Sequence, residues 1–275
     1  MENQTDLFRA TRGEKLFIKI FLICLALLWL FPAYSVITKS LAINGIGNFK
    51  FVLTNDINGV PFIYYFKNSF LVGIGSSLML VAVATLAGFA FSKIQFTGSK
   101  LIFNSVLMCL AVSGPIILVP FMYILKNLNL YNTLWGVILP EVTMSLPFGV
   151  LMMRNYYDNL PGALMESAYI DGANIFQIFT KIYFPLAKPA VINLTVLQIM
   201  WSFQDFLMPT MFLTKGKLFT ATVAVNSFRG AYGMSGQNLG RYNAALVLIA
   251  IPAIVIFVFA QKYIVGGITA GGVKD

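Results

Sequence analysis

Three side chains that suit carbohydrate recognition lie close together in the last third of the chain: Trp201, Gln204 and Asp205. An aromatic ring packs against the apolar face of a sugar, and amide and carboxylate groups hydrogen-bond to its hydroxyls. An ionisable residue inside an apolar segment, here 187–213, indicates a functional role. The alternative is that Asp205 lies near the outer end of that segment, hydrated or paired within the fold. Glu141 is a similar candidate, but its position favours pairing with a neighbouring helix.

Groups for catalysis, metal binding or nucleotide binding are scarce. The chain has no His, and its two Cys residues, Cys24 and Cys109, sit in apolar runs as expected of small core residues rather than of a disulfide. No Gly-x-x-x-x-Gly-Lys-Ser/Thr loop is present, since Gly98-Ser99-Lys100 and Lys215-Gly216-Lys217 lack its pattern. We therefore expect a chain that is not an enzyme, with no catalytic residue, cofactor or metal.

The composition is that of a membrane protein. Of 275 residues, 58% are hydrophobic and 11% charged, and the mean hydropathy is +0.80, whereas soluble domains carry about 25% charged residues. The net charge of +9 fits positive flanks near anionic headgroups better than nucleic-acid binding. We predict a multi-pass membrane protein, with the bilayer and not nucleic acid as its partner.

A membrane-spanning helix needs about 20 mostly apolar residues. Six segments qualify, which predicts an all-α protein with a single domain over residues 1–275; they are 17–38, 69–91, 101–125, 133–153, 187–213 and 244–263. Pro115, Pro120, Pro140 and Pro147 predict kinks or breaks in the third and fourth. The first segment is expected to be an uncleaved span. With the N-terminus inside, eleven of the 19 Lys and Arg residues are cytoplasmic, which places both termini and the loop 154–186 in the cytoplasm.

The loop 154–186 is predicted to contain two short helices at an angle. Asn159 is a possible cap for the first, with Pro161 in its first turn, and Gly172 ends or bends it. An apolar stripe at i, i+3, i+4 and i+7 predicts a second helix, which Pro185 stops; its members are Ile175, Ile178, Phe179 and Ile182. The alternative is an amphipathic helix that only rests on headgroups.

The spacing of residues in this loop resembles a known motif. Glu166, Ala168, Gly172, Ile182 and Pro185 fall in register with the EAA loop of the membrane subunits of binding-protein-dependent ABC importers, with Ser167 and Phe184 as small departures. The resemblance implies coupling helices that dock on an ATPase subunit. In that reading Ala168 allows close approach, Glu166 meets basic groups and Gly172 sets the angle. The implied coupling residues are Glu166, Ser167, Ala168, Asp171, Gly172, Ala173, Ile182 and Pro185.

Further stretches resemble the sugar-importer branch of that family. They are Asn68-Ser69, the run Leu130–Gly136, the run Trp201–Phe206 with Pro209, and the Gly-rich C-terminus Gly266–Lys274, which resembles the maltose-type second permease. The resemblance implies a type I importer permease of six helices in a bacterial cell membrane. It also implies pairing with a second, larger permease, two ATPase subunits and an extracytoplasmic sugar-binding protein. The larger partner would supply most sugar contacts. The outer loop Thr214–Asn243, with Phe228, Tyr232 and Tyr242 among glycines, would reach into the binding protein or form a flexible surface loop.

Two other functions remain open at this point. A permease for a different solute, such as glycerol phosphate, would be expected to carry Arg or Lys within its spans, and none lies at a midplane position. A secondary transporter would need inverted repeats and a buried carboxylate as proton carrier. No convincing repeat is visible, so an ATP-driven oligosaccharide importer is the expected function.

Overall fold

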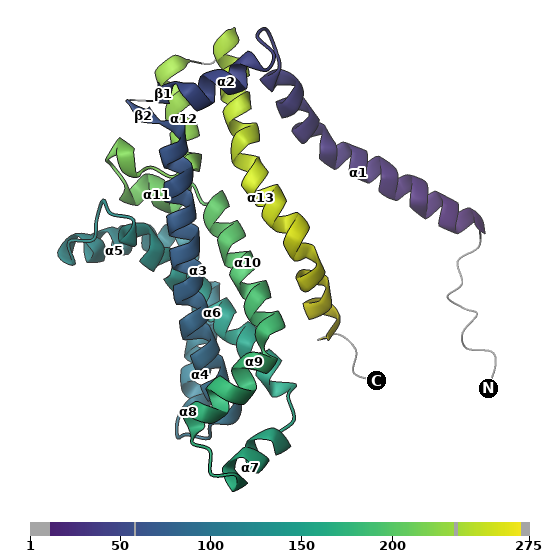
Figure 1. Ribbon diagram of the computed structural model, residues 1–275, viewed down its shortest axis with the longest axis vertical. Coiled ribbons are helices and arrows are strands. Elements are labelled where there is room, and N and C mark those ends of the chain that lie inside the picture. Colours follow the sequence, from purple (N-terminus) through teal and green to yellow (C-terminus); the bar gives the residue numbers. More distant parts are fainter. Residues whose placement is uncertain (1–11, 58, 234–235, 271–275) are drawn as a thin grey trace.

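The computed structural model describes residues 12–57, 59–233 and 236–270, and nearly all of them are helical (Figure 1). The long helices are α1 (Arg12–Ser40), α3 (Phe62–Lys93), α6 (Trp135–Asp158), α10 (Lys188–Gln204) and α13 (Gln237–Ala270). Within these residues, four helices are long and apolar enough to cross a bilayer, namely α1, α3, α6 and α13. The number rises to six if each of two bent helix pairs is one span.

The third and fifth apolar segments are broken. The third consists of α4 (Ser99–Met108), a 3-10 turn (Cys109–Ala111) and α5 (Gly114–Asn127), with 107° between its two halves. α5 therefore projects sideways from the bundle (Figure 1). The break precedes Pro115, which starts α5, whereas Pro120 lies inside it. In the fifth segment, α10 ends at Gln204 and a short helix α11 (Leu207–Phe212) follows.

The fourth segment has no break. α6 is continuous although Pro140 and Pro147 lie inside it, so the predicted interruption there is wrong. Both prolines are buried, and α6 packs chiefly against α3 and α10. Packing on several sides keeps the helix intact, because neighbouring helices restrain the backbone groups that proline leaves unpaired.

One end of the bundle carries α2 (Gly47–Thr54), the antiparallel strand pair β1 (Asp56–Ile57) and β2 (Val60–Pro61), and α12 (Ala221–Tyr232) (Figure 1). The predicted outer loop 214–243 is thus partly helical: it contains a 3-10 turn (Gly216–Leu218), α12 and the start of α13. Asn68 explains why: its Nδ2 donates to the carbonyls of Lys217 (2.9 Å) and Phe219 (3.0 Å). Ser69 Oγ accepts from Ala221 N at 3.0 Å, so α3 holds the start of α12. The side chains of Phe228 and Tyr232 lie outside the described set.

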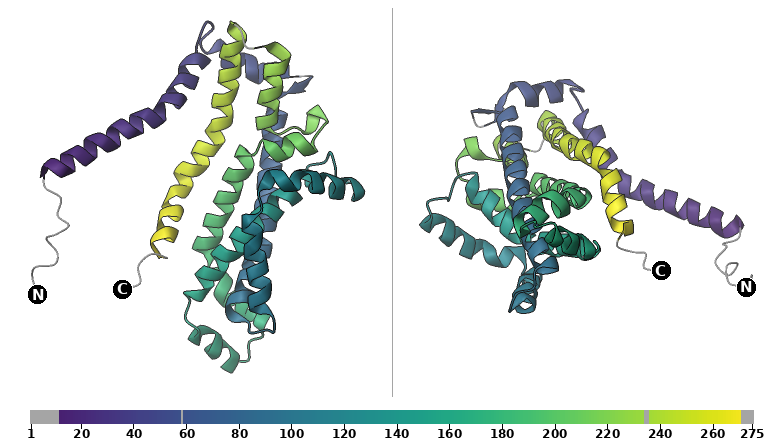
Figure 2. Two further views of the ribbon diagram at one scale, coloured as in Figure 1. Left: turned by 180° about the vertical axis from the view of Figure 1, so that it is seen from behind. Right: turned by 60° about the horizontal axis from the view of Figure 1, so that its bottom comes forward.

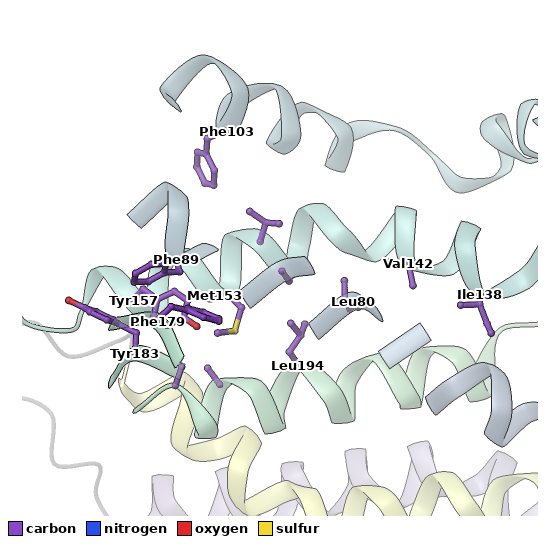
Figure 3. Packing of buried hydrophobic residues seen from close by; sticks show 14 of the residues in the cluster. Leu80, Phe89, Phe103, Ile138, Val142, Met153, Tyr157, Phe179, Tyr183 and Leu194 are labelled. Carbon is purple, nitrogen blue, oxygen red and sulfur yellow. The ribbon is translucent and has the colours of Figure 1, made fainter. Parts of the chain in front are cut away.

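Small residues bring α3 and α6 into backbone contact. A Cβ on Gly88 would lie 2.7 Å from Met153 Cβ and 2.8 Å from the backbone nitrogen of Arg154. A Cβ on Gly149 would lie 3.1 Å from Ala84 Cβ. Helices in membranes associate through such close packing, because lipid removes most of the hydrophobic driving force between them. The buried core therefore follows the α3–α6–α10 contact (Figure 3).

α1 has a different environment from the rest of the bundle. It diverges from the other helices in every view, meeting α13 near one end (Figures 1 and 2). Its apolar side chains are exposed all round, for example Trp29 at 77%. Cys24 on α1 and Cys109 are also exposed free thiols, so the expectation that both are core residues is wrong. α13 continues to Ala270, which makes the start of the Gly-rich C-terminus helical, while residues 271–275 lie outside the described set.

The α3–α6 contact predicts a specific sensitivity. Gly88→Ala should destabilise the folded subunit by about 1–3 kcal/mol, since the added methyl meets backbone that cannot move cheaply. Gly13→Ala is the matched control, because a Cβ there meets nothing within 4 Å. Thermal unfolding of the purified protein in detergent measures the difference, and equal melting temperatures for the two variants would contradict the assigned contact.

Candidate functional site

The segment 154–186 contains two short helical regions, as expected. α7 (Ala163–Ile170) precedes α8 (Ile175–Ile178), which continues as a π-helical turn (Phe179–Tyr183) and α9 (Phe184–Leu186). Two details of the prediction are wrong. Asn159 caps the end of α6 instead of starting α7. Pro185 sits in the first turn of α9, where its missing N–H costs nothing, and the helix ends at Leu186 before a 73° bend into α10.

The turn between α7 and α8 is held by two capping motifs. Gly172 has φ +77, and its N–H donates to the Tyr169 carbonyl (3.0 Å) while Ala173 N donates to the Ala168 carbonyl (3.0 Å). This is the Schellman pattern, which favours Gly at the left-handed position. Asn174 and Gln177 then exchange side-chain and backbone hydrogen bonds of 2.9 and 3.0 Å, a capping box at the start of α8. The Asn-x-x-Gln spacing was readable in the sequence and was missed.

One face of this segment is buried against the bundle. Ala168, Ile178 and Phe179 are buried, whereas Ile175 is 39% exposed and Ile182 is half-buried. The predicted apolar stripe is therefore only partly used. Phe179 and Tyr183 pack against Phe89 of α3, with ring centroids 5.2 Å apart in each case. Figure 3 shows these rings gathered with Tyr157 beside Met153.

Lys93, at the end of α3, ties both ends of the segment to the bundle. Its Nζ donates to the Leu160 carbonyl at 2.8 Å and lies 5.5 Å from the centre of the Tyr183 ring. Tyr156 Oη donates to the Leu186 carbonyl at 3.1 Å, a second restraint on the far end. The segment is thus attached at its entry and its exit, so it moves together with α3 and α6.

The opposite face of the segment is exposed and combines apolar and acidic groups. Ile170 is 86% exposed and Phe176 68%, one on each side of the Gly172 turn. Glu166, Ser167 and Asp171 are exposed, whereas Ala173, Ile182 and Pro185 are half-buried. Exposed apolar residues with a polar rim are typical of a surface that binds another protein. The structure brings together most predicted coupling residues around one turn, and Ile182 and Pro185 lie further along, near the bend into α10.

A cavity of about 470 Å³ lies between α5, α6 and the broken α10–α11 pair. All three predicted substrate-path residues line it: Trp201, Gln204 and Asp205. Trp201 is 41% exposed and stands edge-on to Phe148, with ring centroids 5.4 Å apart. The walls are mainly apolar with a few polar groups, which is the usual character of a small-molecule site.

Asp205 has a structural role in this cavity as well. Its Oδ1 accepts from the backbone N–H groups of Leu207 (2.9 Å) and Met208 (3.3 Å), so it caps the start of α11. Its carbonyl accepts from Thr222 Oγ1 at 2.8 Å. The alternative of pairing within the fold is therefore partly correct. The break between α10 and α11 depends on this carboxylate and still leaves the residue on the cavity wall.

The expected pairing of Glu141 with a neighbouring helix is partly met, because the Ser76 hydroxyl of α3 and the Ser202 hydroxyl of α10 lie beside its carboxylate. Glu141 is 5% exposed, lines the cavity, and neither carboxylate oxygen has a hydrogen-bond partner among the described residues. Gln198 and Ser202 also line the cavity and were missed as site residues. The available signal was their spacing, since Gln198, Ser202 and Asp205 lie at i, i+4 and i+7 on one face of an otherwise apolar helix.

Comparisons with known proteins agree with this architecture. The family model described as binding-protein-dependent transport system inner membrane component matches residues 80–269. The chain is 33% identical to the inner membrane ABC transporter permease protein YcjP of Escherichia coli over 78% of this chain and 75% of that protein. It is 29% identical to the arabinooligosaccharides transport system permease protein AraQ of Bacillus subtilis, over 93% and 94% of the two chains.

A solved structure shares the fold. It is the crystal structure of a bacterial ABC transporter involved in the import of the acidic polysaccharide alginate, with a TM-score of 0.78 and 19% identity, covering 92% of this chain and 98% of that one. At this identity the likeness concerns the fold alone. It confirms the predicted all-α importer permease fold.

Lys93 provides a test of how the segment 154–186 is held. Lys93→Met should raise amide hydrogen exchange in residues 160–183 by roughly threefold to tenfold, the effect of losing about one hydrogen bond. Lys93→Arg keeps a donor and a cation over the ring and should restore most of the protection. Lys100→Met is the control, since this exposed lysine lies on the neighbouring helix α4. Unchanged exchange in Lys93→Met would show that the restraint lies elsewhere.

Proposed function

Because this chain belongs to the binding-protein-dependent transport system inner membrane component family, and is therefore the permease component of an ABC importer, we propose that it forms half of the translocation path of an ATP-driven oligosaccharide importer. In this proposal the whole of residues 1–275 acts as one transmembrane domain. Both termini and the segment 154–186 face the cytoplasm. The single observation that carries the proposal is the exposed face of the Gly172 turn, held rigidly against the bundle.

The turn suits docking on an ATPase subunit. Ile170 and Phe176 present exposed apolar area on both sides of it, and Glu166 and Asp171 add carboxylates that complement basic groups on a partner. The Schellman motif and capping box fix the angle between the two helical parts. Because Lys93 and the Phe89 cluster attach the segment to α3 and α6, displacement of the turn would be transmitted to the spans.

The cavity suits a sugar on the translocation path. Trp201 offers an aromatic face, and Gln204 and Asp205 offer hydrogen-bonding groups at the same wall. An oligosaccharide substrate is supported by the likeness to AraQ, whose name gives arabinooligosaccharides. A phosphorylated solute is disfavoured, because the charged residues that line the cavity are both acidic.

Partner subunits complete the proposal. We infer a second, different permease, two ATPase subunits that hydrolyse ATP, and an extracytoplasmic sugar-binding protein. The fully exposed apolar surface of α1, which stands away from the bundle, is available to a partner helix as well as to lipid (Figure 2). The chain shows no P-loop pattern, so the ATP-driven step requires a separate subunit.

Assembly is the direct test of this function. Co-expression with a neighbouring second permease gene and an ATPase gene should yield a complex of about four chains, with the ATPase in two copies. Reconstituted with its binding protein, the complex should take up sugar only when ATP is supplied. ATP-independent uptake by this chain alone in vesicles would contradict the proposal.

The turn at Gly172 allows coupling to be separated from folding. Gly172→Val should leave the subunit inserted in the membrane. The substitution should change the turn, because the left-handed backbone conformation costs a branched residue about 1–2 kcal/mol. ATP hydrolysis should then proceed with little sugar uptake. Gly162→Val is a matched control in the same segment, since Gly162 has φ −63 and, like Gly172, open space around its Cβ. A normal ratio of uptake to ATP hydrolysis in Gly172→Val would exclude a coupling role.

A further inference from the structure

We propose that Glu141, Gln198 and Ser202 form a hydroxyl-binding subsite for an uncharged saccharide inside the cavity. This rests on the proposed function and goes beyond it, because it assigns ligand contacts to α6 and the buried part of α10. The observation is a group of buried polar side chains that share one cavity and lack partners. Glu141 is 5% exposed, Gln198 1% and Ser202 6%.

The unpaired atoms are oxygens. Both Glu141 carboxylate oxygens, Gln198 Oε1 and Ser202 Oγ are buried without a hydrogen-bond partner among the described residues. The Ser76 and Ser202 hydroxyls lie close enough to interact with the Glu141 carboxylate, although no contact between them has standard hydrogen-bond geometry. Ser76 Oγ donates to the Gly73 carbonyl at 3.3 Å. A buried polar group that stays unpaired is destabilising, because its desolvation is not compensated. Several such groups on one cavity wall indicate that a ligand completes them.

The chemistry of these oxygens selects the ligand. Carboxylate and amide oxygens accept hydrogen bonds, so they match the O–H donors of a sugar. The charged residues on the cavity wall are Glu141 and Asp205, and no residue that lines it within the described chain is basic. A wall without a basic residue offers no charge partner to a uronate or a phosphate. The cavity therefore favours a neutral saccharide over an acidic one.

An inorganic cation fits this wall less well. Calcium takes six to eight oxygen ligands, and the described residues contain no group of three or more Asp, Glu, His or Cys side chains able to hold a metal ion. Trp201 lines the same cavity and offers an aromatic face for stacking on a sugar ring. The subsite then combines one aromatic face with oxygen acceptors deeper in the bundle.

Equilibrium binding to the purified full complex tests the subsite without relying on uptake. Calorimetric titration uses three probes: a neutral oligosaccharide, a uronate oligosaccharide of equal length, and calcium chloride. The neutral sugar should bind at least tenfold more tightly than the other two. Glu141→Gln, which keeps the shape and replaces one oxygen by an NH2 donor, should weaken that binding roughly tenfold, and Gln198→Met should do the same.

Asn193→Leu is the matched control. Asn193 lies on α10, is 6% exposed and has an unpaired Oδ1, but it does not line the cavity. Its loss should change sugar binding by less than twofold. Equal weakening of sugar binding in Asn193→Leu and Glu141→Gln would trace the effect to packing and overturn the subsite. Unchanged sugar binding in Glu141→Gln would also overturn it. So would tighter binding of the uronate oligosaccharide or of calcium than of the neutral sugar. ATP-driven sugar uptake by the wild-type complex distinguishes failure of the subsite from failure of the proposed importer function. If the wild-type complex takes up sugar and the Glu141→Gln complex binds it normally, the subsite alone is refuted. If the wild-type complex neither takes up nor binds any sugar, both are refuted.

Discussion

The close contact between α3 and α6 is the constraint on which the rest of this structure depends. At Gly88 the two backbones meet, and a single added carbon would lie within 3 Å of Met153 and Arg154. In a bilayer, helices gain little from hydrophobic association, so small residues and close packing must hold them together. The next residue, Phe89, packs on Tyr157 and on Phe179 of the segment 154–186 (Figure 3). The same contact thus supports both the bundle and the segment 154–186.

The break between α10 and α11 lies at the wall of the cavity. Irregular backbone at membrane depth is tolerated when it is buried in protein or lines a cavity. The break at 205–206 follows this rule, because Asp205 satisfies two backbone N–H groups of α11 and still faces the cavity. By contrast, α6 contains two prolines and stays unbroken, because it packs against neighbours on several sides. Proline alone therefore does not decide where these helices break.

The Gly172 turn and the cavity are linked through the same helices. α6 contributes Glu141 to the cavity and, at its other end, Tyr156 and Tyr157 to the base of the segment 154–186. α3 contributes Lys93 and Phe89 at that base and Ser76 beside Glu141. A rigid displacement of the turn would shift both helices together. This geometry is what an importer needs if a cytoplasmic event is to change access to a site deep in the bundle.

Much of this protein was determined by its sequence alone. Apolar runs of about 20 residues establish a membrane protein, and the spacing from Glu166 to Pro185 establishes its family, because both signals are local along the chain. The helix–turn–helix of the segment 154–186 was predictable for the same reason, although the Asn174 cap was missed. The tertiary structure decided what depends on distant residues. It placed Glu141 on the wall of a cavity, and it made a helix of 221–232. It also left Cys24 and Cys109 exposed. Composition cannot tell whether an apolar or ionisable side chain faces a neighbouring helix, a cavity or lipid, because only the packing of segments far apart in the chain sets that direction.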